Sequence, residues 1–176
     1  MHFFKTQHVF DHEWSQVTCA NWKKYPNEIT THVIAVDTLR REVDPKTGCL
    51  VTERLICIKQ SVPKVISLII PAQLSFAREV SVVDPKTKVL TLRTQNLTAN
   101  HLLRVFETVT YRPDRNDATK TYFEQEASIA ALLKWKKVCN QLEQFSLQRF
   151  SDNATLGKEA IDSVLKKLSG QTHKAL

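Results

Sequence analysis

The chain reads NWKKYPNEITTHVIAVD over residues 21–37, and within this stretch the pattern changes from helix to strand. A proline disfavours helical geometry in the residue before it, so a helix that carries Trp22 must end by Pro26. The run from His32 to Asp37 is largely apolar and β-branched, which is typical of a strand. The stretch therefore predicts a short helix, a break, and a strand with a lone histidine at its start.

Strand-like segments continue on both sides of this stretch. An opening strand is predicted at His2–Phe10, and Asp11 is expected to cap the helix, in which Trp14 and Val17 fall at helical spacing. Alternating or β-branched segments predict six further strands: His32–Val43, Leu50–Gln60, Ser75–Val83, Val89–Leu97, Leu102–Tyr111 and Thr121–Ile129.

Two nearly identical turns join some of these strands. The chain reads DPKTG at residues 44–48 and DPKTK at residues 84–88. Proline suits the second position of a β-turn because its φ angle is already fixed near the required value. Each turn is flanked by predicted strands, so both are predicted to be hairpins. Short hairpins between successive strands indicate an antiparallel meander.

The pattern changes to a long helix from about Ser128 to Ser169, in which Gly157 could introduce a bend. At 100° per residue its apolar side chains share one broad face. These are Trp135, Val138, Cys139, Leu142, Phe145, Phe150, Ala160, Ile161, Val164 and Leu168. The predicted fold class is α+β: a curved antiparallel sheet of about seven strands, a short N-terminal helix and a long C-terminal helix packed on the sheet. Residues 1–170 form one domain and residues 171–176 a tail, and the pattern allows either a ligand cavity or a filled core.

Composition and motifs exclude several classes of function. The 25 Lys and Arg exceed the 18 Asp and Glu, and a net charge of +7 favours an anionic partner such as nucleic acid, an acidic membrane or an anionic ligand. A nucleic-acid binder is disfavoured because no basic and aromatic stripe is present. No phosphate-loop, GxSxG or HExxH motif occurs, and no run approaches transmembrane length. No signal peptide is expected, and the four cysteines lack zinc-like spacing, so we expect them to be buried and free.

Arg149 and Asn153 project from the middle of the apolar helix face. An unpaired buried guanidinium would be costly, so it needs a partner. One interpretation is an ion pair with a strand carboxylate such as Glu79 or Glu107. Another is an anion held inside the fold, because arginine offers a forked donor for phosphate or carboxylate and asparagine adds amide donors. The residues alone leave these two equally open, and a third option is that Arg149 extends to the helix edge.

Other polar residues have simpler interpretations. The strand arginines Arg54, Arg78 and Arg93 are each most simply expected to point outward, because alternation permits it. His32 is more often a hydrogen-bonded structural histidine than a ligand at such a position. Lys24 is most simply a solvated charge at a helix end.

An apolar segment bounded by prolines lies between two of the strands. It is either a short core helix or a lid that covers a cavity when closed and enters a membrane when open. Lys59 and Lys64 nearby would favour an anionic surface. The lid residues would be Val62, Pro63, Lys64, Val65, Ile66, Leu68, Ile69, Ile70 and Pro71.

Several ordered blocks of the sequence, taken together, resemble one known family. The blocks are NWKKYPN (21–27), THVIAVD (31–37), TERLI (52–56), REVSVVD (78–84) and RFSDNA (149–154). They resemble the PRELI-like family of mitochondrial intermembrane-space lipid-transfer proteins, and most closely its slowmo-type branch. The similarity extends from the opening strand to about Leu168.

The resemblance implies a fold like that of the START and phosphatidylinositol-transfer carriers, with a lipid cavity. It implies a non-enzymatic carrier without cofactor or metal, which moves phosphatidylserine between the mitochondrial outer and inner membranes for phosphatidylethanolamine synthesis. The implied partners are the phospholipid, a small helical chaperone with twin cysteine motifs in a heterodimer, and an anionic membrane surface on which the protein is peripheral. The alternatives are phosphatidic acid transfer for cardiolipin synthesis, or a lipid-free interaction module.

By match of position, the resemblance assigns the head-group contacts to five residues: Lys24, His32, Arg54, Arg149 and Asn153. Relatives often place a lysine just after the Asn-Ala pair, where this chain has Thr155 and Leu156, and Lys158 is expected to substitute. Ile58 and Ser61 stand where phosphatidic-acid carriers can be basic, which weakens the phosphatidic-acid alternative.

Overall fold

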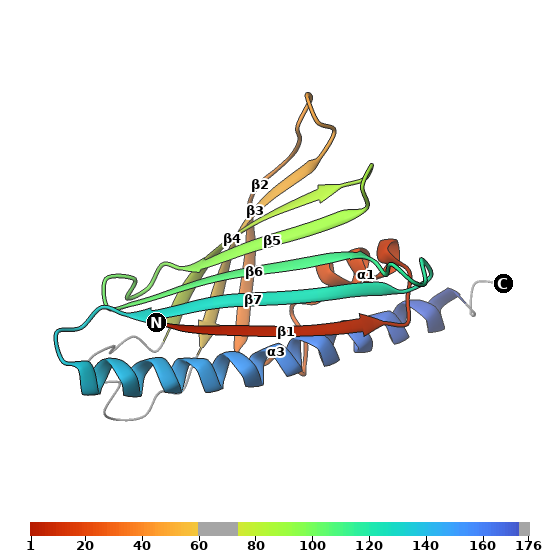
Figure 1. Ribbon diagram of the computed structural model, residues 1–176. Coiled ribbons are helices and arrows are strands. Elements are labelled where there is room, and N and C mark those ends of the chain that lie inside the picture. The colour runs from red at the N-terminus through yellow and green to blue at the C-terminus, as the bar shows by residue number, and fades with distance from the viewer. Residues whose placement is uncertain (60–73, 173–176) are drawn as a thin grey trace.

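The computed structural model describes residues 1–59 and 74–172, and Figure 1 shows their arrangement. The predicted lid, Val62 to Pro71, lies outside the described residues. The tail predicted at 171–176 lies outside them from residue 173 onward.

Within residues 1–59 and 74–172, seven strands form one antiparallel sheet in the spatial order β1-β7-β6-β5-β4-β3-β2. Strands β2 to β7 follow one another as a meander, and β1 pairs with β7, so the predicted fold class is confirmed. The strands differ from the predicted ones by no more than a few residues at their ends. They are β1 (His2–Phe10), β2 (Val33–Val43), β3 (Leu50–Lys59), β4 (Leu74–Asp84), β5 (Val89–Asn96), β6 (Leu103–Pro113) and β7 (Thr121–Ala131).

The two predicted hairpins are confirmed, and both turns use an aspartate in the same way. The Asp44 Oδ1 atom accepts a hydrogen bond of 2.8 Å from the N–H of Lys46, and the Asp84 Oδ1 atom accepts one of 2.9 Å from the N–H of Lys86. Each side chain thereby fixes the first residues of its turn. The backbone then returns through a positive φ, at Gly48 in the first turn and at Lys88 in the second.

The N-terminal helix α1 (Trp14–Trp22) is shorter than predicted. Asp11 does not cap it, because Glu13 occupies the N-cap position and Asp11 Oδ1 instead lies 2.8 Å from the Nζ atom of Lys120. The helix stops before the Tyr25–Pro26 bond, as the proline requires.

The C-terminal helix α3 (Lys136–Thr172) begins later than the predicted Ser128. Ser128 belongs to β7 instead, where it is paired with Phe3 on one side and Phe106 on the other. Strand pairing on both sides therefore decides the conformation of a segment that also has a helical pattern. The helix continues through Gly157 as one element.

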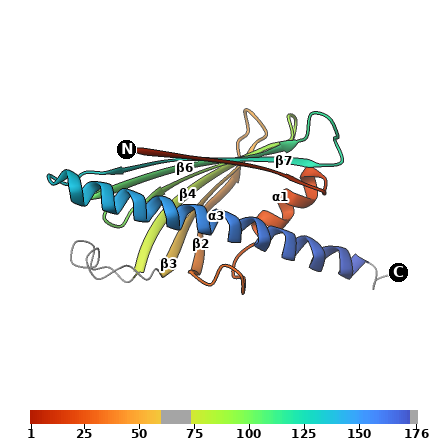
Figure 2. The same cartoon turned by 60° about the horizontal axis from the view of Figure 1, so that its bottom comes forward.

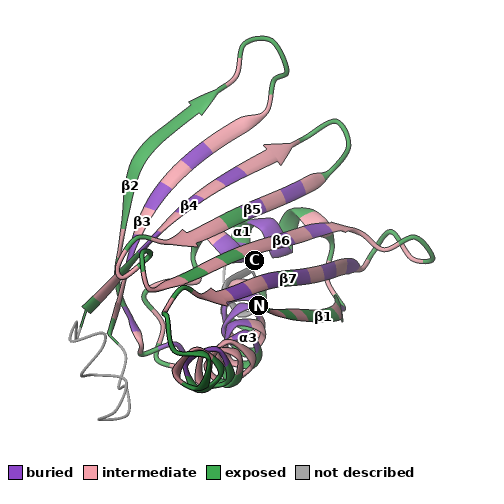
Figure 3. Cartoon of the chain, turned by 60° about the vertical axis from the view of Figure 1, so that its left-hand side comes forward, coloured by how far each residue is buried: buried purple, intermediate pink, exposed green. Residues whose placement is uncertain are grey.

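Helix α3 crosses the concave face of the sheet, as Figure 2 shows, and Figure 3 shows the sheet curving over it. Its C-terminal part packs with α1 and strands β1, β5, β6 and β7 around a closed core. Of the predicted apolar face, Leu142, Ala160, Ile161 and Val164 are buried. The prediction for Trp135 is wrong, since this residue precedes the helix and is 72% exposed. Ala154 and Leu165 are buried but were not predicted.

The cysteines are all free, as predicted, yet none of them is fully buried. Cys19 is exposed on α1, and the other three are half-buried, so the prediction of buried thiols is wrong. Among the described residues, no helix is long and apolar enough to cross a bilayer.

Candidate functional site

A cavity of about 300 Å³ lies between α3 and the concave face of the sheet. That volume is at the lower end of the range for small-molecule sites. The sequence allowed either a cavity or a filled core, and the described residues show a cavity next to a filled core at the α1 end. Over Leu142 to Ile161, α3 contributes side chains to the cavity wall, and strands β3 to β7 contribute the opposite wall.

All six predicted head-group residues line this cavity: Lys24, His32, Arg54, Arg149, Asn153 and Lys158. They come from the segment after α1, the approach to β2, strand β3 and helix α3, which are far apart in the sequence. The structure brings them together, and their role as ligand contacts stays a prediction.

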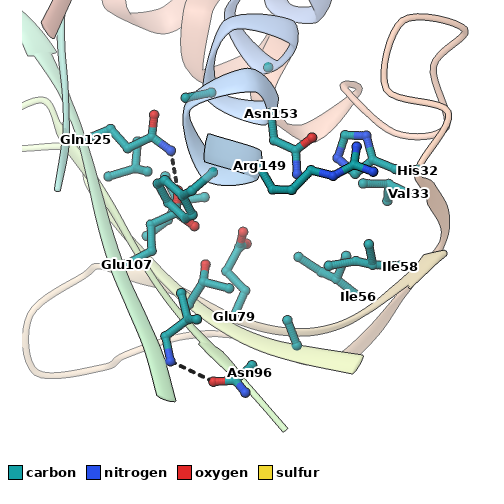
Figure 4. A pocket seen from close by; sticks show the side chains of 18 of the residues that line it. His32, Val33, Ile56, Ile58, Glu79, Asn96, Glu107, Gln125, Arg149 and Asn153 are labelled. Carbon is teal, nitrogen blue, oxygen red and sulfur yellow. Dashed lines mark hydrogen bonds between the residues drawn. The ribbon is translucent and has the colours of Figure 1, made fainter. Parts of the chain in front are cut away.

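Arg149 and His32 lie beside each other at one side of the cavity, with Asn153 next to Arg149 (Figure 4). Burial lowers the pKa of His32, and the positive charges of Lys24 and Arg149 lower it further. The guanidinium of Arg149 also lies 5.6 Å from the ring centroid of Phe145, which helps hold it in place. This side of the cavity therefore favours an anion, because an anion would relieve the repulsion between the positive charges of Lys24 and Arg149.

Lys24 approaches the same side from the segment that follows α1. Its Nζ atom lies 5.1 Å from the ring centroid of Tyr25 and close to Gly157 of α3, where an added Cβ atom would stand 3.0 Å from it. Lys24 is half-buried in the cavity wall, so the expectation of a simple solvated helix-end charge is wrong.

Arg54 points into the fold, which corrects the expectation that it points outward. Its side chain is buried, and its Nε and terminal nitrogen lie 2.9 and 2.7 Å from the Oε1 atom of Glu79. The β3–β4 register places the two residues opposite each other. The guanidinium also lies 5.1 Å from the ring centroid of Trp22, so Arg54 ties α1 to the sheet.

The other two strand arginines point outward, as expected. Arg78 is 42% exposed and forms an ion pair with Glu53 across the β3–β4 pair, and Arg93 is exposed on β5. These positions differ from Arg54 because their strand neighbours on the same face are also solvent-accessible.

Acidic and amide groups line the sheet wall of the cavity and were not predicted as site residues. The sequence suggests Glu79 and Glu107 only as ion-pair partners of Arg149, and it yields no prediction for Gln125. The Nε2 group of Gln125 donates a hydrogen bond to Glu107. Burial, and then the charge of Glu79, raise the pKa of Glu107, whereas the Gln125 bond and the charge of Lys24 act in the opposite direction.

A signal for Glu107 is present in the sequence. It has the same parity on β6 as Val109 and Tyr111, which are buried, so strict alternation places it on the inner face. In β7, Gln125 has the same parity as the buried Phe123 and Ala127. Alternation applied to polar as well as apolar residues would have found both.

Comparison with known sequences gives a consistent result. The model of the PRELI-like family matches residues 15–171. The mitochondrial protein UPS2 of Saccharomyces cerevisiae is 52% identical over 99% of this chain and 76% of its own length. A UPS-like protein of Schizosaccharomyces pombe is 48% identical over 96% of this chain and 91% of its own length. The slowmo homolog of Dictyostelium discoideum is 32% identical over 100% of this chain and 77% of its own length.

Comparison with solved structures shows the fold alone. The Zhui aromatase/cyclase of a Streptomyces species has a TM-score of 0.60 at 9% identity, covering 94% of this chain and 95% of that one. A START superfamily protein of Mycobacterium smegmatis has a TM-score of 0.59 at 9% identity, covering 93% of this chain and 99% of that one. The predicted likeness to START carriers is confirmed at the level of fold.

Proposed function

The chain belongs to the PRELI-like family, and from this premise we propose that it carries a single phospholipid between mitochondrial membranes without catalysing a reaction on it. The relative from Saccharomyces cerevisiae is named as a mitochondrial protein, and we place this chain in mitochondria as well. The predicted family resemblance is thereby confirmed, and the lipid-transfer role is the function that the cavity supports best.

The observation that carries the proposal is a basic cluster at one side of a cavity that also has a large apolar wall. We define the basic cluster as the basic residues Lys24, His32, Arg149 and Lys158 together with the neighbouring amide Asn153, all of which line the cavity. Apolar side chains cover much of the remaining wall: Ile56, Ile58, Phe76, Leu92, Leu103, Val105, Ile129, Leu142, Phe145 and Phe150. A phospholipid has the matching character, with an anionic phosphate at one end and acyl chains at the other.

Each member of the basic cluster has a distinct part in this proposal. Arg149 presents a forked donor to phosphate oxygens, and Asn153, one helical turn further along α3, adds an amide donor. Lys24 and Lys158 add compact positive charges, and His32 adds a ring N–H. Arg54 acts indirectly, because its charge is compensated by Glu79 and its contact with Trp22 holds α1 beside the cavity.

We propose phosphatidylserine as the cargo, delivered from the outer to the inner membrane for phosphatidylethanolamine synthesis. The support is the similarity to the slowmo-type branch and the neutral Ile58 at a position that can be basic in phosphatidic-acid carriers. The proposed compartment is the intermembrane space, and the proposed partner is a small helical chaperone with twin cysteine motifs in a heterodimer. The net charge of +7 suits peripheral contact with an anionic membrane.

The test is transfer of fluorescent phosphatidylserine and phosphatidic acid between vesicles, with Arg149→Glu as the variant. The variant should fold as the wild type does and lose most of its transfer, because a carboxylate replaces the forked donor. Arg93→Glu is the matched control, since Arg93 lies exposed on β5. Full transfer by Arg149→Glu would remove Arg149 from the site.

The wild-type measurement also separates the alternatives. Preference for phosphatidic acid would keep the carrier mechanism and change the cargo to the precursor of cardiolipin. A protein that takes up neither lipid from vesicles would instead be an interaction module with an empty cavity.

A further inference from the structure

The cavity has charged groups of both signs on facing walls. Of the basic cluster, Arg149, Asn153 and His32 lie together at one side of the cavity, whereas Glu79 and Glu107 lie on the sheet side, on β4 and β6 (Figure 4). We call the carboxylates Glu79 and Glu107, together with the neighbouring amide Gln125, the acidic wall. A site built for a purely anionic ligand would gain nothing from these carboxylates, because like charges in a cavity of low dielectric repel each other strongly.

The two carboxylates of the acidic wall are not equivalent. Glu79 accepts two close contacts from Arg54, with nitrogens at 2.9 and 2.7 Å from its Oε1 atom, so its charge is compensated by the protein. Glu107 instead accepts hydrogen bonds from neutral groups, the amide of Gln125 and the hydroxyl of Thr94. Glu107 therefore has the greater capacity to accept a positively charged group from a ligand.

Gln125 supplies an independent observation at the same place. Its side chain is only 7% exposed, and it lines the cavity beside Glu107. Its Nε2 group donates to Glu107, but its Oε1 atom has no hydrogen-bond partner within residues 1–59 and 74–172. A buried acceptor without a donor is unfavourable, because the atom has lost its water and gained nothing in return. The acidic wall thus presents a carboxylate and an unpaired amide oxygen, both of which can take donors from a ligand.

We propose that Glu107, with Gln125 beside it, binds the primary ammonium group of a phospholipid head group whose phosphate is held by the basic cluster. The inference rests on the proposed function, since it assumes that a phospholipid occupies the cavity. An ammonium group has three donors and one positive charge, which matches two acceptors of which one is anionic. The facing walls then bind the two ends of one head group.

This arrangement makes Glu107 a specificity-determining residue. Phosphatidic acid has no ammonium to offer Glu107, and its extra negative charge would be repelled by that carboxylate. Phosphatidylserine instead places an ammonium there and keeps its carboxylate and phosphate for the basic cluster. Burial and Glu79 raise the pKa of Glu107 in the absence of ligand, and a bound ammonium would favour the charged form again.

The test compares three lipids in the same vesicle-transfer assay: phosphatidylserine, an analogue in which hydrogen replaces its ammonium group, and phosphatidic acid. Hydrogen bonds between charged groups are the stronger kind, so wild type should prefer phosphatidylserine over the analogue by about tenfold or more. Glu107→Gln should lower that ratio to about one and raise transfer of phosphatidic acid. Glu53→Gln is the matched control, because Glu53 pairs with Arg78 outside the cavity.

A wild type that transfers phosphatidylserine and the analogue equally, or a Glu107→Gln variant that keeps the wild-type ratio, would overturn the inference alone. A wild type that transfers none of the three lipids would overturn the proposed function with it. Circular dichroism and thermal melting establish that the variants fold. Should Glu107→Gln fail to fold, Gln125→Leu is measured in the same way, and an unchanged ratio there would also overturn the inference.

Discussion

Gly157 of α3 lies directly against the amino group of Lys24, so close that a Cβ atom at position 157 would stand 3.0 Å from Nζ. Glycine in a helix interior costs about 1 kcal/mol relative to alanine, because it loses more backbone freedom on folding. The amino group of Lys24 occupies the space beside Gly157 that a Cβ atom would need. Helix stability is thus lower at the point where the helix meets a predicted head-group residue.

Gly157→Ala should therefore separate stability from function. The helix gains about 0.5 to 1 kcal/mol from the better helix former, while the new methyl group requires the Lys24 amino group to move aside. We expect a higher melting temperature together with slower phospholipid transfer between vesicles. Thr155→Ala, at an exposed position of the same helix, is the control and should leave transfer unchanged. Unchanged transfer in Gly157→Ala would show that the position of Lys24 is unimportant.

Arg54 and Glu79 provide a second prediction, in which the main effect is on stability. Removing one partner of a buried ion pair leaves an uncompensated charge and typically costs about 3 to 5 kcal/mol. Arg54→Met should therefore unfold at much lower denaturant, and the double variant Arg54→Met/Glu79→Leu should recover most of the loss. Arg78→Met, which breaks the half-exposed pair with Glu53, should cost less than about 1 kcal/mol. Equal losses in the two single variants would contradict the assignment of Arg54 as a structural residue.

The different outcomes for Arg54 and Arg78 show where sequence reasoning reaches its limit. Alternation established that the two arginines could face either way, but the choice depends on which carboxylate lies opposite. That pairing follows from the β3–β4 register, which puts Glu79 across from Arg54. Register across a long connection cannot be obtained from a single sequence, because a shift of one residue reverses every side chain.

The strand topology could be predicted from the sequence more readily than the strand register. The matched aspartate turns at 44–48 and 84–88 predicted two hairpins from local chemistry alone, and both are present. The predicted start of α3 at Ser128 is wrong because pairing with β1 and β6 holds Ser128 in a strand. Helical periodicity does not reveal such pairing. Helical periodicity alone singled out Arg149 and Asn153, whereas Lys24, His32, Arg54 and Lys158 were assigned through the family resemblance, which supplied long-range proximity that no local pattern contains.

His32 provides a prediction on pH dependence. Its pKa is lowered in the folded protein by burial first and then by Lys24 and Arg149, so the unfolded chain binds a proton there at a higher pH than the folded chain does. Stability from this group is therefore full above about pH 6.5 and is lost as the pH falls through 6.5 toward the lower folded pKa. Denaturant unfolding between about pH 5 and 8 should show a smaller loss on acidification in His32→Gln than in wild type. Parallel pH profiles would contradict the lowered pKa.

The same histidine should respond in the opposite direction when the cavity is filled. A bound phosphate places negative charge beside His32 and raises its pKa, so lipid uptake should be accompanied by proton uptake. Uptake from vesicles should then increase as the pH falls from about 7.5 to 6, and His32→Gln should reduce this dependence. A wild type whose lipid uptake does not change over this range would place the phosphate away from His32.

The two aspartate turns form a matched pair for a final prediction, because they differ at the residue with positive φ. Gly48 adopts φ of 76°, which glycine does without steric cost, whereas Lys88 adopts φ of 53° with a Cβ atom present. A left-handed conformation costs an ordinary residue about 1 to 2 kcal/mol, and glycine gives back part of that gain through its greater freedom in the unfolded chain. Lys88→Gly should therefore stabilise the protein by about 0.5 to 1 kcal/mol, and Gly48→Lys should destabilise it by a similar amount. The measurement is the denaturation midpoint, which should shift in opposite directions in the two variants. Both turns lie away from the cavity-lining residues, so lipid transfer should stay at the wild-type rate in each variant. Shifts of the same sign would mean that the lysine side chain makes a contact that outweighs the backbone strain.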